Sequence, residues 1–568
     1  SRQQFYFYAF TFVSYIYCKY QTFYHSNETC KHIDSGWVCG VIMNAEDSVQ
    51  YLSFRGIPYA QQPLGELRFK ELKPVEPWDN YLDATEDGPI CPQYDEVYSR
   101  LANPQRGMSE ACIYANVHVP IVSRNTAKLL PIFVFIHGGG FQAGSGSTDM
   151  HGPDYLVSKG MIVMSFNYRI NVFGYFSMNN KLFPGNNSLR DIYTFLRWVR
   201  RNAGAFGGNC NDVTLAGESS GAASAHLMSL SKATTGLFQR VMIMSGTGIP
   251  AFYSSSPSNA LLVANMLLTE LGINSTDPVY IHDKLINMPL DKIMKANRIV
   301  QSETGLVSFV PVVESSYEGV TRILDDEPIK LLKEGRGKDI PLIIGFTSVE
   351  CEFFRKRLGY LDVVGMIKKD PAAILPKRLS EAVSQARGRE LGQRVMDKYF
   401  NGTPTVDEYI KCCSDILFIY PAFKLAQWKA GMSGAPVYLY QFAFDSTYNI
   451  VKDALQLKYE GGGAHVEDLT FIFRINSMVG TAKSFPPRSR DDLMRYWMTE
   501  FVANFIKCDK PFCDDPSDWP QVDACLLNYQ ALHEPLRIET NIPATSEQRD
   551  MIAFFDSIEI SARLVYIE

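Results

Sequence analysis

The sequence predicts an α/β fold with one large, mostly parallel β-sheet and helices on both of its faces. Two observations carry this prediction. Short apolar runs without polar alternation recur along the chain, as strands covered on both faces require. Helical patterns follow several of these runs, and such alternation of strand and helix is typical of a parallel sheet. Strands are expected at 130–137, 161–168, 213–216, 241–244, 341–346 and 435–444.

The expected helices lie between these strands, over 191–202, 224–230 and 258–271. The chain has 568 residues, more than the roughly 100–150 of a common domain. However, no repeat, low-complexity stretch or Pro/Gly/Ser-rich linker divides it. We therefore expect a single domain over 31–568, preceded by an N-terminal extension over 1–30.

The composition is that of a globular protein with a substantial core, with 46% hydrophobic and 20% charged residues. The net charge of −6 is small, and no Lys/Arg tract forms a basic surface, so no nucleic-acid partner is expected. The 12 cysteines include no C-x-x-C pair, which argues against a zinc site and a redox motif. Neither a metal nor a cofactor is expected.

Several features favour the secretory route and an extracellular location. Scattered cysteines together with N-glycosylation sequons are typical of an oxidising compartment. The apolar run 5–18 after Arg2 is shorter than the about 20 residues of a membrane span, and it resembles the hydrophobic region of a signal peptide. The alternative is an aromatic-rich extension packed on the surface. No later segment is apolar enough to cross a bilayer. The sequons begin at Asn27, Asn186, Asn274 and Asn401.

A candidate nucleophile lies in the sequence G-x-S-x-G at 217–221 (GESSG). The motif directly follows the expected strand 213–216 and directly precedes an expected helix. A sharp strand-to-helix turn crowds the backbone on both sides of its serine, so both flanking positions need glycine. Such a turn lifts the hydroxyl above the sheet edge, which makes Ser219 the predicted nucleophile. The alternative is a simple glycine-rich connection.

A serine hydroxyl needs a base and a group that orients the base. His465 lies in a glycine-rich loop after the last expected strand, and such loops bring side chains to the end of a sheet. Glu350 follows the strand 341–346 by a short loop and can reach the same edge. Glu352 and Asp415 remain alternatives by residue type. The chain order Ser, Glu, His is the order of α/β-hydrolases.

An oxyanion hole is expected at 137–141 (HGGGF), directly after the strand 130–137. Consecutive glycines let backbone N–H groups approach a substrate closely. Preplaced N–H donors stabilise the oxyanion that an ester carbonyl becomes in the transition state. The expected donors are the amides of Gly139, Gly140 and Ser220, and His137 is expected to brace the loop. The alternative is a flexible turn.

These motifs resemble the type-B carboxylesterase/cholinesterase family, and the likeness runs from about Gly40 to beyond Trp519. The resemblance implies an α/β-hydrolase fold and the triad Ser219, Glu350 and His465. It also implies a disulfide between Cys91 and Cys112. The landmarks are FRGIPYA at 54–60, LRF at 67–69, SEAC at 109–112, Asn116, HGGGF at 137–141, NYR at 167–169, FGG at 206–208, GESSGAAS at 217–224 and SG at 245–246.

The chain departs from the family pattern at several positions. Ala111 replaces an aspartate, and Ser220 replaces the usual alanine while keeping its backbone donor. Cys351 stands where glycine commonly follows the triad acid, as in some insect juvenile-hormone and antennal esterases, which favours Glu350 over Glu352. Glu218, where juvenile hormone esterases typically have Gln, weakens the prediction of a hormone esterase. Ile192 in place of a common glutamine argues the same way.

The resemblance implies a serine esterase that acts on small-molecule esters through an acyl-enzyme, with xenobiotic, odorant, pheromone or hormone esters as candidate substrates. Glu218 is expected either to adjust the field in the pocket or to be a merely structural carboxylate. The likeness also places a hydrogen bond of Ser245 near Glu350. The pairing of the other cysteines is open, and a free thiol at Cys351 is one of the outcomes.

Three alternatives to this function remain. A scavenger that binds esters or organophosphates would keep the triad but turn over slowly. A lipase would need an apolar lid, and no such segment is evident. A cholinesterase holds a quaternary ammonium on an aromatic face, best that of Trp, in its first disulfide loop. The loop from Cys91 to Cys112 has no Trp, and its only aromatic residues are Tyr94 and Tyr98, which argues against acetylcholine as the substrate.

Overall fold

A computed structural model describes residues 28–95, 107–121, 128–249, 253–305, 307–479, 484–514, 519–535 and 539–562. Within these ranges an 11-stranded sheet has the order β14-β13-β12-β11-β10-β9-β7-β8-β6-β4-β3, and β1, β2 and β5 form a small separate sheet. The strands are β1 (Cys30–Ile33), β2 (Gly36–Cys39), β3 (Val41–Asn44), β4 (Gln50–Pro58), β5 (Leu82–Asp83), β6 (Tyr114–Pro120), β7 (Leu130–Ile136), β8 (Ile162–Phe166), β9 (Gly208–Glu218), β10 (Arg240–Met244), β11 (Leu342–Thr347), β12 (Val437–Phe442), β13 (Tyr529–Leu532) and β14 (Glu539–Ile542).

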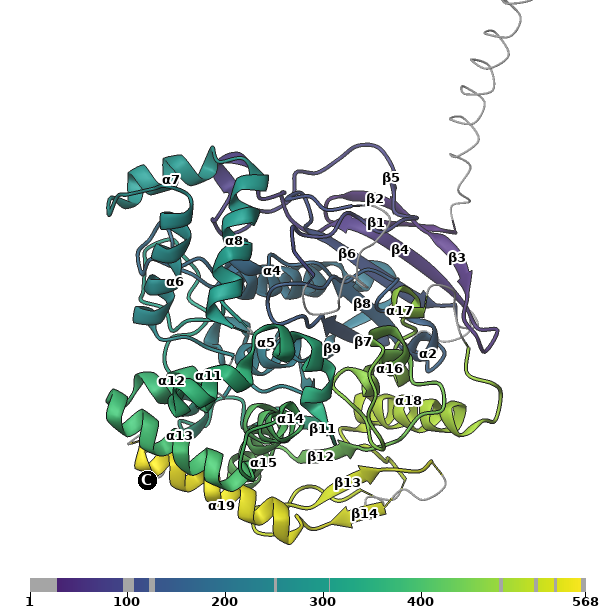
Figure 1. The fold of residues 1–568 in the computed structure, drawn as a ribbon. Coiled ribbons are helices and arrows are strands. Elements are labelled where there is room, and N and C mark those ends of the chain that lie inside the picture. Colours follow the sequence, from purple (N-terminus) through teal and green to yellow (C-terminus); the bar gives the residue numbers. More distant parts are fainter. Residues whose placement is uncertain are drawn as a thin grey trace, which may run out of the picture.

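The helices cover both faces of this large sheet (Figure 1). They are α2 (Asp154–Val157), α3 (Asn171–Tyr175), α4 (Asn187–Asn202), α5 (Ser220–Leu230), α6 (Pro257–Glu270), α7 (Pro278–Ile286), α8 (Leu290–Thr304), α9 (Pro328–Lys333), α10 (Arg355–Tyr360), α11 (Val363–Lys369), α12 (Lys377–Glu381), α13 (Gln385–Tyr399), α14 (Val406–Ser414), α15 (Tyr420–Gly431), α16 (Ile450–Leu455), α17 (Asn476–Val479), α18 (Arg490–Cys508) and α19 (Ser546–Ser561).

The centre of the sheet is parallel, from β8 through β7, β9, β10, β11 and β12 to β13. Antiparallel pairs join β3, β4 and β6 at one edge and β14 at the other. The carboxyl ends of parallel strands meet at one edge of a sheet, where ligands bind in open α/β folds. The turns after β7, β9, β11 and β12 therefore reach a common region.

Side chains of the central strands alternate between two apolar cores. In β7, Ile132, Val134 and Ile136 pack into the core shared with α4, α5 and α15. Phe133 and Phe135 point the other way, into the core shared with α2, α16 and α18. Every strand from β7 to β12 is thus covered on both faces, which explains why its sequence shows no polar alternation.

The predicted α/β class and the parallel central sheet are confirmed. All six expected strands occur with end shifts of a few residues, and the three expected helices are α4, α5 and α6. Helix α5 begins at Ser220, earlier than expected, because the turn before it consists of a single residue, Ser219. The division into an extension 1–30 and one domain 31–568 stays a prediction, since residues 1–27 lie outside the described part of the chain.

No helix among the described residues combines the length and apolar character that a bilayer crossing requires. One of the expected glycosylation sites does not fit the fold. Asn186 is fully buried, and its side chain both donates to the Val312 carbonyl and accepts from the Val312 amide. A glycan on this nitrogen would break the loop contact and has no space. Asn274 and Asn401 are exposed, and Asn27 lies outside the described residues.

Candidate active site

Ser219 occupies a one-residue turn between β9 and α5, with φ 57° and ψ −124°. An L residue rarely adopts this backbone conformation, and it persists only where the surroundings enforce it. Here the two glycines of the motif, each two residues away from Ser219, leave no room for a side chain. A Cβ on Gly217 would lie 2.3 Å from the Gly221 carbonyl oxygen, and a Cβ on Gly221 would lie 2.1 Å from that of Ile136. The turn has the strand-to-helix geometry of the nucleophile elbow that the motif predicts.

His465 and Glu350 form a buried pair at the same edge of the sheet. The His465 Nδ1 atom lies 2.6 Å from Glu350 Oε2, and both side chains are almost fully buried. The other carboxylate oxygen of Glu350 accepts a hydrogen bond from the Thr347 amide at 2.7 Å. Because the Glu350 carboxylate can only accept a hydrogen bond, the tautomer of His465 with its proton on Nδ1 is favoured. The Nε2 atom is then left as the basic nitrogen.

The Nε2 atom of His465 faces the carboxylate of Glu218, the residue that ends β9. The two atoms Nε2 and Glu218 Oε1 are 3.1 Å apart, and Glu218 is completely buried. Burial raises the pKa of Glu218 to about 8, although the charge of His465 opposes the shift. For His465, burial lowers the pKa, but the carboxylates of Glu218, Glu350 and Asp468 outweigh it and the pKa ends above its ordinary value.

No hydrogen bond joins His465 Nε2 to the Ser219 hydroxyl within the described structure. In unliganded enzymes such bonds are often long or misaligned and tighten when substrate binds. The Ser219 side chain lies near Tyr253, a fully buried residue. Burial raises the pKa of the Tyr253 phenol well above its ordinary value, and the nearby Ser219 side chain partly opposes the shift.

Aromatic rings surround the imidazole of His465. Phe353 and Phe354, from the 3₁₀ turn η4 (Glu350–Phe354), lie 5.7 and 5.2 Å from it between ring centroids. Phe418, from the π-helix η6 (Asp415–Ile419), lies 4.8 Å away. These rings keep water from the imidazole. Sequence reasoning missed Phe418, because it is distant in the chain from every motif and lies in an ordinary apolar helix pattern.

The glycine loop after β7 lies against the nucleophile elbow. A Cβ on Gly138 would lie 2.5 Å from a carboxylate oxygen of Glu218, so the loop needs a glycine there. Gly139 and Gly140 have φ of 112° and 62°, and neither amide donates to another described residue. The Ser220 hydroxyl accepts a hydrogen bond from the Phe141 amide at 3.2 Å. Ser220, which is an alanine in the family pattern, thus links the elbow to the glycine loop.

His137 begins this loop and braces it. Its ring stacks on Tyr168 at 4.3 Å, its Nδ1 lies 2.9 Å from the Gly138 oxygen, and its carbonyl accepts from the Tyr168 hydroxyl. Burial lowers the pKa of His137 to about 4, so the ring is neutral near pH 7. It has no contact that would make it the base for Ser219.

Two rivals for the role of the acid lie elsewhere in the structure. Glu352 binds Arg355 through both carboxylate oxygens, at 2.6 and 2.9 Å. Asp415 accepts a hydrogen bond from the Tyr399 hydroxyl at 2.8 Å. Ser245 does not make the expected bond near Glu350, since its buried hydroxyl has no partner in the described structure. Its backbone amide instead donates to Gly345, which joins the ends of β10 and β11.

The structure pairs Cys91 with Cys112, with an S–S distance of 2.01 Å. It also pairs Cys351 with Cys413, so the option of a free thiol beside Glu350 is wrong. The helix that carries Cys413 packs on the turn η4, a contact that no local sequence pattern indicates. The other pairs are Cys30–Cys39 and Cys508–Cys513.

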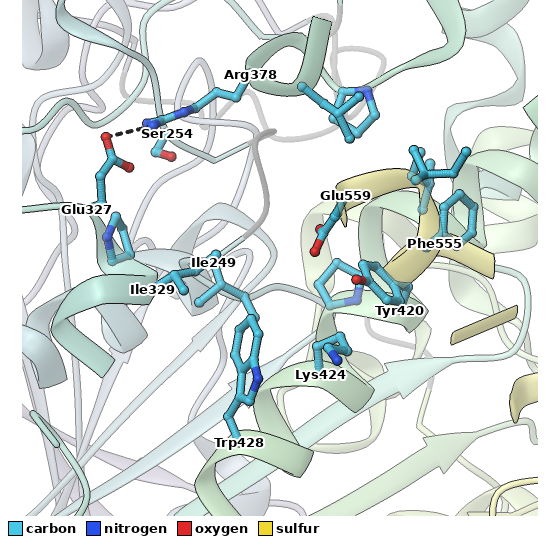
Figure 2. Close-up of a pocket in the computed structure, with 16 residues that line it drawn as sticks. Ile249, Ser254, Glu327, Ile329, Arg378, Tyr420, Lys424, Trp428, Phe555 and Glu559 are labelled. Atoms are coloured by element: carbon cyan, nitrogen blue, oxygen red, sulfur yellow. Dashed lines mark ion pairs between the residues drawn. The ribbon is translucent and has the colours of Figure 1, made fainter. Parts of the chain in front are cut away.

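A separate cavity of about 800 Å³, including its opening to solvent, lies between α9, α12, α15 and α19. Figure 2 shows apolar side chains such as Ile329 and Trp428 along its wall, with the carboxylate of Glu559 directed inward. The Arg378 guanidinium forms an ion pair with Glu327 at 2.6 Å at one end. None of the side chains of the candidate triad lines this cavity, so it lies apart from the candidate active site.

Comparisons with known proteins identify the family of the chain. A model of the carboxylesterase family matches residues 27–549. The juvenile hormone esterase of Heliothis virescens is 49% identical over 540 residues, which cover 94% of each chain. The juvenile hormone esterase of Tribolium castaneum is 28% identical over 562 residues, or 92% of each chain.

Solved structures of esterases also resemble this protein. The structure is similar to the crystal structure of juvenile hormone esterase from Manduca sexta with OTFP covalently attached, with a TM-score of 0.90 and 49% identity. That match covers 94% of this chain and 99% of the other. A PNB esterase is similar with a TM-score of 0.71 and 27% identity, over 92% of this chain and 99% of that one.

The sheet order and the nucleophile elbow define an α/β-hydrolase. The chain belongs to the carboxylesterase family, and it is a carboxylic ester hydrolase. The resemblance stated from the motifs is therefore confirmed. Glu218 and Ile192 weaken the prediction of a hormone esterase, yet the Heliothis and Manduca enzymes share 49% of aligned residues with this chain.

Proposed function

We propose that Ser219, His465 and Glu350 form the catalytic triad of this esterase. The observation that supports the proposal most strongly is the 2.6 Å contact between His465 Nδ1 and Glu350 Oε2, beside a serine held in the strained elbow turn. This arrangement supplies a nucleophile, a base and an orienting carboxylate in the chain order of α/β-hydrolases.

In the proposed mechanism, His465 Nε2 takes the proton of Ser219 as the hydroxyl oxygen attacks the ester carbonyl carbon. Glu350 holds the ring and stabilises the imidazolium. The amides of Gly139, Gly140 and Ser220 donate to the oxyanion. The tetrahedral intermediate collapses, and the alcohol leaves with the proton from His465. Water then attacks the acyl-enzyme by the same steps, which release the acid and restore Ser219.

We also propose a substrate class and a location. Juvenile hormone esterases are among the most similar relatives, so a hormone ester of that type is the first substrate to test, with xenobiotic, odorant and pheromone esters as the wider set. An extracellular location is supported by the disulfides and by the exposed sequons at Asn274 and Asn401.

The test is hydrolysis of p-nitrophenyl esters of increasing acyl length and of juvenile hormone by the purified protein, with Ser219→Ala alongside. We expect steady turnover that is lost in the variant. The loss should reach about a millionfold in kcat, as for removal of a triad serine. Turnover that survives in Ser219→Ala would contradict the proposal. A burst of one product per protein that then stalls would favour the scavenger alternative.

A further inference from the structure

Glu350 can orient His465 only if the short turn that carries it stays fixed. It is the first residue of η4, and its own side chain makes the bonds to Thr347 and His465 described above. On the side of the strand, which ends at Thr347, the turn is held by the sheet and by the loop of His465. The Val349 amide donates to the Gly463 carbonyl, and the Glu350 carbonyl accepts from the His465 amide. On its other side the turn is attached to α14 by the next residue, Cys351, which is completely buried, and by the ion pairs of Arg355 with Glu352 and Asp407.

Cys351 is attached to the end of α14 in two ways. Its sulfur is bonded to that of Cys413, and its amide donates to the Ser414 hydroxyl at 2.9 Å. The same hydroxyl donates to the Ile410 carbonyl at 2.8 Å, which fixes its direction within the helix. Backbone and side chain of Cys351 are therefore both tied to one helical turn.

The chain continues from this turn of α14 as a helix as far as the imidazole of His465. After Ser414 it widens into the π-helix η6, and Phe418 of η6 packs on the ring of His465. Single π-helical turns occur often at functional sites. One helical segment thus contacts both the backbone beside Glu350 and the ring of His465. The distance between these two residues decides whether the hydrogen bond between them forms.

We propose that the Cys351–Cys413 disulfide is a positioning element for the acid of the triad, which holds the Glu350 carboxylate at the Nδ1 atom of His465. This inference rests on the proposed function, because it takes Glu350 as the triad acid. The disulfide touches neither substrate nor the reacting atoms. It acts through the position of η4 relative to the α14–η6 segment.

The adjacent thiol of Cys412 does not compete for this bond. Burial, reinforced by the Asp415 charge, raises the pKa of Cys412 well above its ordinary value. A protonated thiol is a poor nucleophile, so exchange with the neighbouring disulfide is suppressed. Cys412 therefore offers a matched control, a buried cysteine of the same helical turn that is not bonded to Cys351.

The experiment compares the double variant Cys351→Ala/Cys413→Ala with Cys412→Ser and with Cys508→Ala/Cys513→Ala, which removes a disulfide outside the site. Each is assayed for kcat, KM, pH profile and Tm. We expect the first variant alone to lose kcat, by up to about a hundredfold, the cost of about a 1 Å misplacement of reacting groups. KM should stay within about twofold, because substrate contacts are unchanged.

The pH profile separates positioning from mere stability. A looser Glu350 raises the pKa of His465 less, so the acidic limb of kcat/KM should move to lower pH in the double variant. A folded double variant with the kcat and acidic limb of Cys412→Ser would overturn the inference. If the alanine pair does not fold, Cys351→Ser/Cys413→Ser keeps the volume without the bond, and full kcat in that variant would equally overturn it. Activity that persists in Ser219→Ala would instead refute the proposed function itself.

Discussion

At the scale of single residues, the imidazole of His465 lies between two buried carboxylates, Glu350 at Nδ1 and Glu218 at Nε2. The second contact was not expected from the motif alone, which left Glu218 as either an electrostatic or a structural group. Its 3.1 Å approach to the basic nitrogen favours an electrostatic role. A proton shared between Glu218 and His465 would also compete with the proton of Ser219 for the Nε2 atom of His465.

Glu218→Gln should move the acidic limb of kcat/KM to lower pH. In the proposed mechanism His465 acts as a base only when neutral. Glu218 and His465 titrate as a coupled pair, because the imidazolium favours the ionised form of Glu218 and the Glu218 carboxylate in turn contributes to raising the pKa of His465. Activity is therefore lost as pH falls through that raised pKa, and removing the charge lowers the pKa. The measurement is the pH–rate profile with a p-nitrophenyl ester. Glu352→Gln is the matched control, since that carboxylate is also buried but binds Arg355. An acidic limb identical to that of the wild type would refute the electrostatic role.

At the scale of elements, the turn from β9 to α5 depends on close packing of backbone against backbone. Gly217→Ala should destabilise the fold, because the new Cβ meets the Gly221 carbonyl at 2.3 Å. Overpacking of this kind costs about 1–3 kcal/mol. Thermal unfolding measures the loss. Gly204→Ala, at a helical position with open space around it, should leave Tm nearly unchanged. Equal Tm values for the two variants would contradict this account of the elbow.

Elements with local signals were predictable from sequence. The buried strands, the elbow and the glycine loop follow from apolar runs and glycine spacing, which depend on a few adjacent residues. The partners of Cys351 were not predictable. Cys413 lies 62 residues further along the chain, and only the docking of α14 on η4 brings the two together. The same docking places Phe418 against His465, and no periodicity in the sequence indicates it.

At the scale of the whole molecule, a buried ion pair joins α4 to the distant segment that precedes α9. Arg190 and Glu314 are bonded and fully buried, and Glu314 also accepts from the amides of Ile323 and Leu324 at 2.9 Å. Asn186 adds its hydrogen bonds to Val312 nearby. These contacts fix the segment that lies against α4.

Arg190→Met should therefore destabilise the protein strongly, by about 3–5 kcal/mol, since it leaves the Glu314 carboxylate buried without its cation. The control is Arg201→Met, which removes a solvent-exposed pair with Asp34 and should cost at most about 1 kcal/mol. Chemical denaturation of the two variants compares them. Equal denaturation midpoints for the two variants would mean that the buried ion pair stabilises the protein no more than the exposed pair does.

Burial also decides which sequons can carry glycans. In protein expressed through a secretory pathway, peptide mapping should find Asn186 unmodified, because its side-chain nitrogen is buried and donates to Val312. Exposed Asn274 and Asn401 are the sites where we expect glycans. A glycan on Asn186 of the active enzyme would contradict the placement of this loop.

The central claim is that Ser219 becomes a covalent nucleophile through His465 and Glu350. The most direct measurement is labelling with an organofluorophosphate, followed by intact mass and peptide mapping, for the wild type and for His465→Ala and Glu350→Gln. We predict one adduct per wild-type chain, located on Ser219, and labelling slowed by about a thousandfold or more in both variants. An adduct on another residue, or labelling of the variants at the wild-type rate, would contradict the assignment of the triad.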